Sequence, residues 1–152
     1  MDFKTLANQY RNELLDNVLP FWLEHSQDIE FGGYFSCLDR EGKVFDTDKF
    51  IWLQGREVWM FSMLYNKVEK RQEWLDCAVQ GGEFLKKYGH DGNYNWYFSL
   101  DRSGRPLVEP YNIFSYTFAT MAFGQLSLAT GSQEYADIAK KTFEIILSKV
   151  DN

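Results

Sequence analysis

The sequence predicts an all-α protein with short β-hairpins, organised as part of an α/α toroid. Three observations lead to this prediction. Five stretches place apolar residues at helical spacing, the stretches alternate between two kinds of helix, and a hairpin-like sequence occurs twice. We therefore expect five helices in the order outer, inner, outer, inner, outer. They should belong to one incomplete domain over residues 1–152.

Three of the stretches, at residues 3–24, 73–88 and 133–150, have one apolar stripe and a charged opposite face, as surface helices do. The stripes are Phe3, Leu6, Tyr10, Leu14, Val18 and Phe21, then Trp74, Ala78, Gly81, Leu85 and Tyr88, then Tyr135, Ile138, Thr142, Ile145 and Ile146. Before the last stretch, Gly131 is placed to end a helix and Ser132 to cap the next. These three stretches are predicted to be the outer helices.

The stretches at residues 53–68 and 112–129 are different. The first has two apolar sides, and the second is apolar nearly all round. The second includes Ile113, Phe114, Phe118, Met121, Phe123, Leu126 and Leu128. Because a helix that is apolar on all sides is buried on all sides, these two stretches are predicted to be the inner helices.

An internal repeat supports the alternation. Tyr-Phe-Ser-Cys-Leu-Asp-Arg-Glu-Gly-Lys at residues 34–43 recurs as Tyr-Phe-Ser-Leu-Asp-Arg-Ser-Gly-Arg at residues 97–105. Alternating aromatic residues before an Asp-Arg-x-Gly turn are typical of a β-hairpin. Asp39 and Asp101 occupy equivalent turn positions, which favours a role in turn geometry over a catalytic pair. The repeated unit is an outer helix, a hairpin and an inner helix, and both hairpins should lie at the same end of the layer.

The chain contains two such units and half of a third, so most of a closed ring is missing. Either the chain is the N-terminal part of a longer protein, or another copy covers the exposed inner-helix surface. That surface surrounds Trp59, Met63, Phe118 and Met121, and it should make the isolated chain pair or aggregate.

Composition excludes several functional classes. The net charge is −6 without a block of Lys and Arg, so nucleic acid is not an expected partner. There is no run of eighteen apolar residues and no signal-peptide core after Met-Asp-Phe-Lys, so we expect no membrane association and a cytoplasmic location. Cys37 and Cys77 match no metal or redox spacing and are expected to be reduced structural thiols. No Gly-rich phosphate loop is present, and no cofactor or metal is predicted.

One helix face carries the pattern of a sugar site. Trp52, Arg56 and Trp59 are spaced by four and three residues, so they should share a face of the 53–68 helix or its first turn. An arginine between tryptophans can stack on a sugar ring and hold its oxygens. The alternative, taken from spacing alone, is that the tryptophans are core residues and that Arg56 pairs with Glu57 or Asp48.

With these residues in view, the whole sequence resembles the N-acylglucosamine 2-epimerase family, of which it would form about the first two-fifths. The matching motifs are Gly32-Gly33-Tyr34-Phe35, Cys37-Leu38, Gly42-Lys43-Val44, Trp52-Leu53-Gln54-Gly55-Arg56, Val58-Trp59-Met60, Gly81-Gly82-Glu83-Phe84-Leu85, Ile113-Phe114-Ser115 and Ala129-Thr130-Gly131. Related cellobiose 2-epimerases and mannose isomerases usually have Leu-Asn-Ala-Arg where this chain has Leu-Gln-Gly-Arg at residues 53–56, which favours the N-acylglucosamine branch.

The resemblance implies the N-terminal part of an (α/α)6 barrel that epimerises N-acetylglucosamine and N-acetylmannosamine at C2. Such an enzyme removes the C2 proton with one histidine and returns it to the opposite face with another. Arg56 lies where the family has its essential arginine, which would hold O1 and O2 of the enediolate-like intermediate. The family's two histidines belong to later inner helices, and this sequence does not contain those helices.

The resemblance also suggests a set of substrate-binding residues. We predict Arg56 as catalytic, and Trp52, Gln54, Arg56, Phe114 and Ser115 as contacts to an amino sugar or related monosaccharide. For Phe114 and Ser115 the alternative is packing at a helix start. His25 and His90 both follow outer helices, so they are expected in turns or at the surface and away from a central site.

Three functions remain open. The leading one is the N-terminal part of a sugar 2-epimerase, inactive or nearly so alone. The second is a standalone carbohydrate-binding or interaction domain that lacks the catalytic half. The third, an α/α-toroid glycosidase, needs two carboxylates at hydrolytic separation, and Glu57 is the one acidic residue of the inner helices that could serve.

Overall fold

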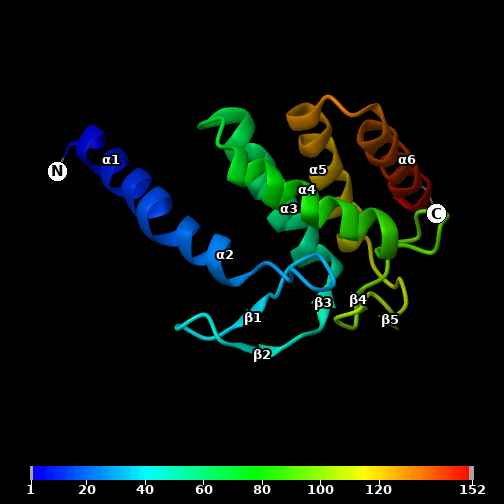
Figure 1. The fold of residues 1–152 in the computed structure, drawn as a ribbon. Helices are drawn as coiled ribbons and strands as arrows, with labels where there is room; N and C mark the ends of the chain where they lie inside the picture. Colours follow the sequence, from blue (N-terminus) through cyan, green and yellow to red (C-terminus); the bar gives the residue numbers. More distant parts are fainter. Residues whose placement is uncertain (1, 151–152) are drawn as a thin grey trace.

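The computed structural model describes residues 2–150 of the chain, and its fold is helical with small sheets at one end (Figure 1). The helices are α1 (Phe3–Glu13), the π-helix η1 (Leu14–Val18), α2 (Leu19–His25), α3 (Ile51–Lys67), α4 (Gln72–Tyr88), α5 (Phe114–Thr130) and α6 (Gln133–Val150). The strands are β1 (Cys37–Leu38), β2 (Val44–Asp46), β3 (Lys49–Phe50), β4 (Ser99–Leu100) and β5 (Pro106–Val108). The five predicted helices are confirmed, with α1, η1 and α2 forming one run.

The predicted helix at residues 3–24 contains a change of helical type that the sequence pattern does not show. The π-helix η1 lies directly before α2, which has Pro20 near its start. Proline has no N–H to donate to the preceding turn, so the regular helical hydrogen bonding is interrupted there. The run continues through η1 into α2, and we call α1 together with η1 the N-terminal arm.

The inner helices pack against each other, and each has an outer helix beside it. Helix α3 contacts α5 along its length, α4 packs on α3, and α6 packs on α5. The core lies between these four helices and includes Val58, Phe61, Trp74, Ala119 and Phe123, all at most 1% exposed. The predicted order of outer and inner helices is therefore confirmed for this part of the chain.

The helix ends follow local hydrogen bonds and differ from the predicted ends by a few residues. Helix α3 begins at Ile51, because Phe50 is the last residue paired in β3. Helix α5 begins at Phe114, whose N–H is accepted by Asn112 Oδ1 at 3.0 Å. It ends at Gly131, as predicted, where φ is 74°. Ser132 Oγ then accepts the N–H of Tyr135 at 3.5 Å at the start of α6.

Both predicted hairpins form, and both lie at the strand-bearing end of the helical layer (Figure 1). A third strand, β3, was not predicted. It pairs antiparallel with β4, placing Lys49 opposite Leu100 and Phe50 opposite Ser99. Strand β3 therefore joins the second hairpin to the start of α3, and the two repeated units are held together at this end.

The two hairpin turns are built in the same way, which confirms the internal repeat. Asp39 Oδ1 accepts the N–H of Lys43 at 2.8 Å, and Asp101 Oδ1 accepts the N–H of Arg105 at 2.9 Å. The glycine inside each turn has a positive φ, of 83° in the first and 95° in the second. Because side-chain-bearing residues avoid this conformation, the glycine of the Asp-Arg-x-Gly pattern is required by the turn.

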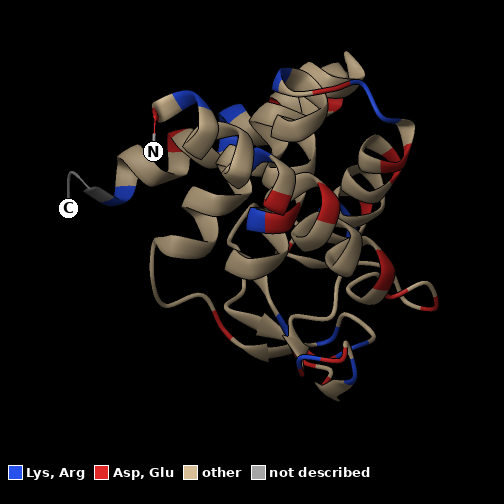
Figure 2. Cartoon of the chain, turned by 90° about the vertical axis from the view of Figure 1, so that its left-hand side faces the viewer, with Lys and Arg blue, Asp and Glu red and all other residues tan. Residues whose placement is uncertain are grey.

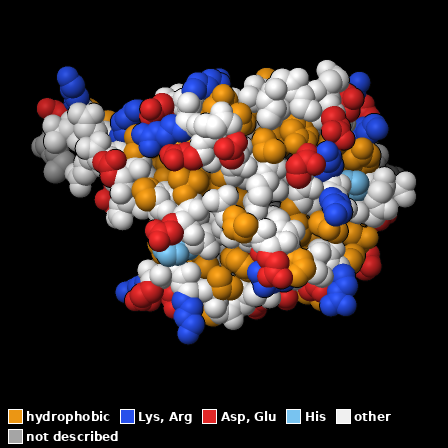
Figure 3. Space-filling model, viewed as in Figure 1, with side chains coloured by type: hydrophobic (Ala, Val, Ile, Leu, Met, Phe, Trp, Pro, Cys, Tyr) orange, Lys and Arg blue, Asp and Glu red, His pale blue; other side chains and the backbone are white. Residues whose placement is uncertain are grey.

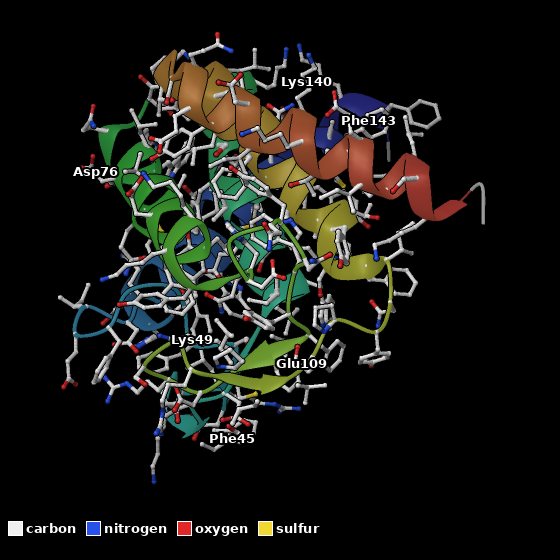
Figure 4. All side chains as sticks on the ribbon, turned by 90° about the vertical axis from the view of Figure 1, so that its right-hand side faces the viewer. Phe45, Lys49, Asp76, Glu109, Lys140 and Phe143 are labelled. Atoms are coloured by element: carbon white, nitrogen blue, oxygen red, sulfur yellow. The ribbon has the colours of Figure 1, made fainter. Side chains whose placement is uncertain are left out.

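A buried ion cluster fixes the loop between α2 and β1. The Lys49 ammonium is fully buried and donates to Asp28 Oδ2 at 2.9 Å, to the Gly32 carbonyl at 2.6 Å and to the Arg102 carbonyl at 2.9 Å. The Arg102 guanidinium donates to both oxygens of Asp28, at 2.9 and 3.0 Å. Figure 4 shows Lys49 inside the molecule, between the strands and the helices. The cluster holds the loop that precedes β1 against the second hairpin.

Charged residues are dispersed over the described surface. Figure 2 shows Lys and Arg interspersed with Asp and Glu, without a continuous basic face in that view. Among the helices of residues 2–150, none is both long enough and apolar enough to cross a membrane.

Candidate functional site

Arg56 lies exposed on the first turns of α3, above aromatic rings from both inner helices. The centre of its guanidinium is 5.8 Å from the centroid of the Trp52 ring and 5.4 Å from that of Phe118 on α5. The two rings are themselves 6.2 Å apart and inclined by 48°. Stacking of this kind restricts the guanidinium while leaving N–H groups free to bind oxygen atoms.

These side chains line a hollow of about 460 Å³ that we call the aromatic pocket. Its lining residues are Trp52, Arg56, Phe98, Tyr111, Asn112, Phe114 and Phe118. They come from α3, from the segments before and after the β4–β5 hairpin, and from α5. Aromatic faces suit the C–H faces of a sugar ring, while a guanidinium and an amide suit its hydroxyl and carbonyl oxygens.

The structure brings three of the predicted site residues together. Trp52, Arg56 and Phe114 all line the aromatic pocket, and Phe114 is 62% exposed at the start of α5. Four further lining residues were not in the predicted set: Phe98, Tyr111, Asn112 and Phe118. Phe98 belongs to the repeated hairpin sequence, in which it is equivalent to Phe35. This equivalence is the sequence signal that could have pointed to Phe98. Tyr111 and Asn112 lie in a connecting loop, where no periodic pattern points to a common site.

Gln54 does not line the aromatic pocket, and its amide is fully used inside the protein. Its Oε1 accepts the N–H of Tyr34 at 2.8 Å, and its Nε2 donates to the Tyr34 carbonyl at 2.8 Å. The side chain is completely buried. This paired contact secures the loop before β1 to α3, so Gln54 is not among the residues that we propose to touch a sugar.

Ser115 is also buried, at 2% exposure, and is absent from the lining of the aromatic pocket. It follows Phe114 in the first turn of α5, where its side chain points to the protein interior while Phe114 points outward. Ser115 therefore packs inside the protein at the helix start, which is the alternative given for it above. Phe114 does not.

Trp59 lies on the other side of Arg56. It lines a second hollow of about 300 Å³ together with Trp22, Ser36, Leu53, Arg56, Glu57 and Met60. Arg56 is thus shared by the two hollows, with Trp52 on one side and Trp59 on the other. Trp52, Arg56 and Trp59 share a face of α3, as predicted, but the two tryptophans line different hollows.

Comparison with known proteins places the chain in a family. The family model described as N-acylglucosamine 2-epimerase (GlcNAc 2-epimerase) matches residues 33–152. The chain belongs to the N-acylglucosamine 2-epimerase family. Over 137 residues it is 45% identical to the mouse (Mus musculus) protein named N-acylglucosamine 2-epimerase, a match that covers 88% of this chain and 33% of the mouse protein. The cellobiose 2-epimerase of Dictyoglomus turgidum is 29% identical over 148 residues, covering 96% of this chain and 38% of that protein.

Solved structures agree with the family assignment. The cellobiose 2-epimerase of Bacillus thermoamylovorans B4167 superposes with a TM-score of 0.86 at 30% identity, covering 94% of this chain and 37% of that one. The epimerase of Spirochaeta thermophila gives the same TM-score at 24% identity, which supports the fold. The chain therefore has the fold of part of an (α/α)6 barrel, and it spans about a third of the length of the curated relatives that it matches.

The two histidines of this epimerase-family chain lie outside the aromatic pocket, and His25 is the last residue of α2, not a turn residue after it. His25 ends α2, packs 4.9 Å from the Phe21 ring and sits under Gly42 of the first hairpin. His90 Nδ1 accepts the N–H of Gly92 at 3.0 Å, and burial lowers the pKa of its imidazole. No histidine lines the aromatic pocket among the described residues.

Glu57 of this epimerase-family chain is an acidic residue whose environment is unusual. It is half-buried in the hollow beside Trp59, and burial raises the pKa of its carboxyl to about 8, against a smaller lowering by the hydrogen bond with Ser26. Tyr34 and Cys77 face it from the neighbouring loop and from α4, and burial raises the pKa of both. With its pKa raised to about 8, Glu57 carries a proton at neutral pH.

Protonation of Glu57 predicts a pH-dependent stability. Because its pKa is higher in the folded than in the unfolded state, the folded chain binds more protons between about pH 4.5 and 8, and its stability falls as pH rises through this range. We expect Glu57→Gln, which keeps the shape of the neutral acid, to remove this decline. Urea unfolding at several pH values would measure it. The lowered pKa of His90 makes stability rise with pH and so opposes the effect of Glu57. The test is therefore the difference between the variant and the wild type. Parallel curves of stability against pH for the two proteins would contradict the prediction.

Proposed function

We propose that this chain forms the N-terminal part of a cytoplasmic sugar 2-epimerase, as one incomplete domain over residues 1–152, and that its aromatic pocket binds the sugar. The relatives support this proposal by their names, which describe N-acylglucosamine and cellobiose 2-epimerases. The identity of 45% to the mouse protein, against 29% to the cellobiose enzyme, favours an N-acyl amino sugar as substrate. The proposed reaction interconverts N-acetylglucosamine and N-acetylmannosamine.

The observation that carries the proposal is the position of Arg56 over the rings of Trp52 and Phe118. Epimerisation at C2 of an open-chain sugar removes the proton next to the carbonyl, and negative charge then develops on O1 and O2. A guanidinium presents two parallel N–H groups to two such oxygens and keeps its charge at every working pH. In this proposal Arg56 binds O1 and O2, and the aromatic walls hold the carbon chain and exclude water.

Proton transfer needs two bases on opposite faces of C2, and the aromatic pocket supplies none of the right kind. Its polar lining residues are Arg56, Tyr111 and Asn112, which offer a guanidinium, a phenol and an amide but neither an imidazole nor a carboxylate. We propose that both bases come from the part of the enzyme beyond this chain. The isolated chain should then bind sugar weakly and transfer no proton.

A graft tests the proposed activity. The segment of mouse N-acylglucosamine 2-epimerase that this chain matches would be replaced by this chain, and we call the product the grafted enzyme. We expect the grafted enzyme to interconvert N-acetylglucosamine and N-acetylmannosamine, measured by chromatography of the two sugars. A folded grafted enzyme without this activity would count against the proposed substrate and reaction.

A standalone carbohydrate-binding domain is the second candidate. The observation in its favour is that the described residues alone form a hollow with aromatic walls and a guanidinium. This function predicts sugar binding by the isolated chain with an affinity that the graft does not improve. The 2-epimerase function predicts a clear gain in affinity on grafting, because groups from the remaining part then contact the sugar as well.

A further inference from the structure

Asn112 lies in the wall of the aromatic pocket, two residues before the first residue of α5. It is half-buried and lines the pocket together with Arg56 and Trp52. Its Oδ1 accepts the N–H of Phe114 at 3.0 Å, where α5 begins. Because a backbone N–H needs an acceptor, this contact fixes which half of the amide is the oxygen and directs the Nδ2 group away from it. The start of α5 therefore orients the side chain.

The Nδ2 group of Asn112 keeps its hydrogens available for a ligand. In the part of the chain that the structure describes, no protein group accepts a hydrogen bond from it. Gln54 is the contrast, since Tyr34 uses both halves of its amide. With its oxygen directed to the helix start, Asn112 offers N–H donors to a molecule in the pocket.

The other polar residues of the pocket are less selective for a substituent. Tyr111 is 66% exposed, and its hydroxyl both donates and accepts, so it suits a sugar hydroxyl in either sense. Arg56 is assigned to the reacting oxygens in the proposed function. On the face that Figure 3 shows, charged side chains of both signs are interspersed with hydrophobic ones, so no field of one sign sorts substrates there. Discrimination between substituents then depends on single donors such as Asn112.

Acylated and free amino sugars differ in the hydrogen bonds that they can make. An acyl group carries a carbonyl oxygen, which only accepts. The amine of an unacylated amino sugar, in its ammonium form, only donates and carries a positive charge. Facing Asn112 Nδ2, the carbonyl oxygen forms a hydrogen bond, whereas the ammonium group opposes donor to donor in a pocket that already holds the Arg56 cation.

We propose that Asn112 is a specificity-determining residue whose Nδ2 donates to the acyl carbonyl oxygen of an N-acyl amino sugar in the aromatic pocket, so that the site selects acylated over free amino sugars. This inference rests on the proposed function, because it takes the aromatic pocket to be the sugar site. One amide then has two roles: its oxygen holds the start of α5, and its nitrogen recognises the substrate.

The side-chain amide signals of Asn112 test the contact in the isolated chain. Proton–nitrogen NMR would identify these signals by their loss in Asn112→Asp, and N-acetylglucosamine or glucosamine would then be titrated at a pH where glucosamine is an ammonium ion. We expect the Asn112 side-chain signals to shift with N-acetylglucosamine and to shift far less with glucosamine. The indole N–H signal of Trp52 reports in the same spectra whether sugar occupies the pocket.

Lys149→Gln is the matched control for this titration. Asn112 also borders a second hollow of about 360 Å³, which Lys149 lines and the aromatic pocket does not share with it. The shift of Asn112 should be unchanged in this variant. A loss of the shift would assign the contact to the second hollow and contradict the inference.

Three further outcomes would contradict the inference. A response of Trp52 to N-acetylglucosamine without a response of Asn112 would place the acyl group elsewhere in the pocket. Equal shifts of Asn112 with both sugars would show that the contact does not distinguish them. The absence of a response from both residues would contradict sugar binding by the pocket, and this inference with it.

Asn112→Asp in the grafted enzyme tests the selection itself. Aspartate keeps an oxygen for the N–H of Phe114 but replaces the Nδ2 donors by a second, negatively charged oxygen. Tm should stay unchanged, whereas KM for N-acetylglucosamine should rise about tenfold with a smaller change in kcat. Glucosamine, measured as an inhibitor, should bind more tightly, because the new carboxylate attracts its ammonium group.

Asn93→Asp is the matched control, because it adds the same charge at an exposed loop residue outside the aromatic pocket. It should leave KM and the inhibition by glucosamine unchanged. A lowered Tm with an unchanged preference between the two sugars in Asn112→Asp would show that Asn112 acts through the fold alone, which contradicts the inference. An inactive grafted enzyme together with the expected Asn112 shift in the isolated chain would contradict the proposed activity but support this inference, so the two can fail separately.

Discussion

In the grafted enzyme we expect Arg56→Lys to lower kcat by about 10² to 10³ with little change in KM. Lysine keeps the positive charge but cannot present two parallel N–H groups to O1 and O2. The lost contact belongs mainly to the enediolate, where both oxygens carry charge, so the loss appears in turnover. Steady-state kinetics with N-acetylglucosamine and with N-acetylmannosamine would measure it in both directions.

Arg71→Lys is the matched control for this prediction. Arg71 also stacks on a tryptophan, 4.8 Å from the Trp74 ring centroid, but it precedes α4 and is not part of the aromatic pocket. It should leave kcat and KM unchanged. An unchanged kcat in Arg56→Lys would remove Arg56 from the site, and an equal fall in Arg71→Lys would show that the loss comes from a general effect on the fold.

The second large effect concerns the buried ion cluster. We expect Asp28→Ala to reduce the free energy of unfolding by about 3–5 kcal/mol, because it leaves the buried Lys49 ammonium without its anion. Burial acts to raise the pKa of Asp28, but hydrogen bonds from Arg102 and Lys49 outweigh it and hold that pKa below its usual value. Asp28 is thus charged near neutral pH and serves both cations. Urea unfolding followed by tryptophan fluorescence would measure the loss.

Two comparisons make this prediction specific. Glu69→Ala breaks an exposed pair with Arg71 and should cost about 0–1 kcal/mol. Lys49→Met in the Asp28→Ala background removes the unpaired cation and should restore part of the lost stability. A small effect of Asp28→Ala, similar to that of Glu69→Ala, would show that the cluster contributes little to the fold.

The helices and hairpins could be predicted because their signals are local. Apolar residues at a period of 3.6 mark the five helices, and the Asp-Arg-x-Gly pattern carries its own turn geometry in Asp39 and Asp101. Strand β3 is only two residues long and pairs with β4 about fifty residues later, so it has no signal of its own. The π-helix η1 keeps the apolar stripe and changes only the hydrogen bonding, which composition does not reveal.

The site was predicted less completely, because side chains acquire their roles from distant partners. Lys49 is of a residue type that is usually exposed, and its burial depends on Asp28 and Arg102 from other parts of the chain. Gln54 belongs to a family motif, but its partner Tyr34, twenty residues earlier, uses its whole amide. Arg56 and Trp52 could be predicted because both belong to one helical turn.

Exchange of the C2 proton with solvent deuterium tests the central claim most directly. The claim is that this chain holds the sugar with Arg56 while the bases lie in the part beyond it. In deuterium oxide, N-acetylmannosamine should incorporate deuterium at C2 with the grafted enzyme and none with the isolated chain, as followed by proton NMR. Exchange by the isolated chain, or its absence in a folded grafted enzyme that binds the sugar, would contradict the account.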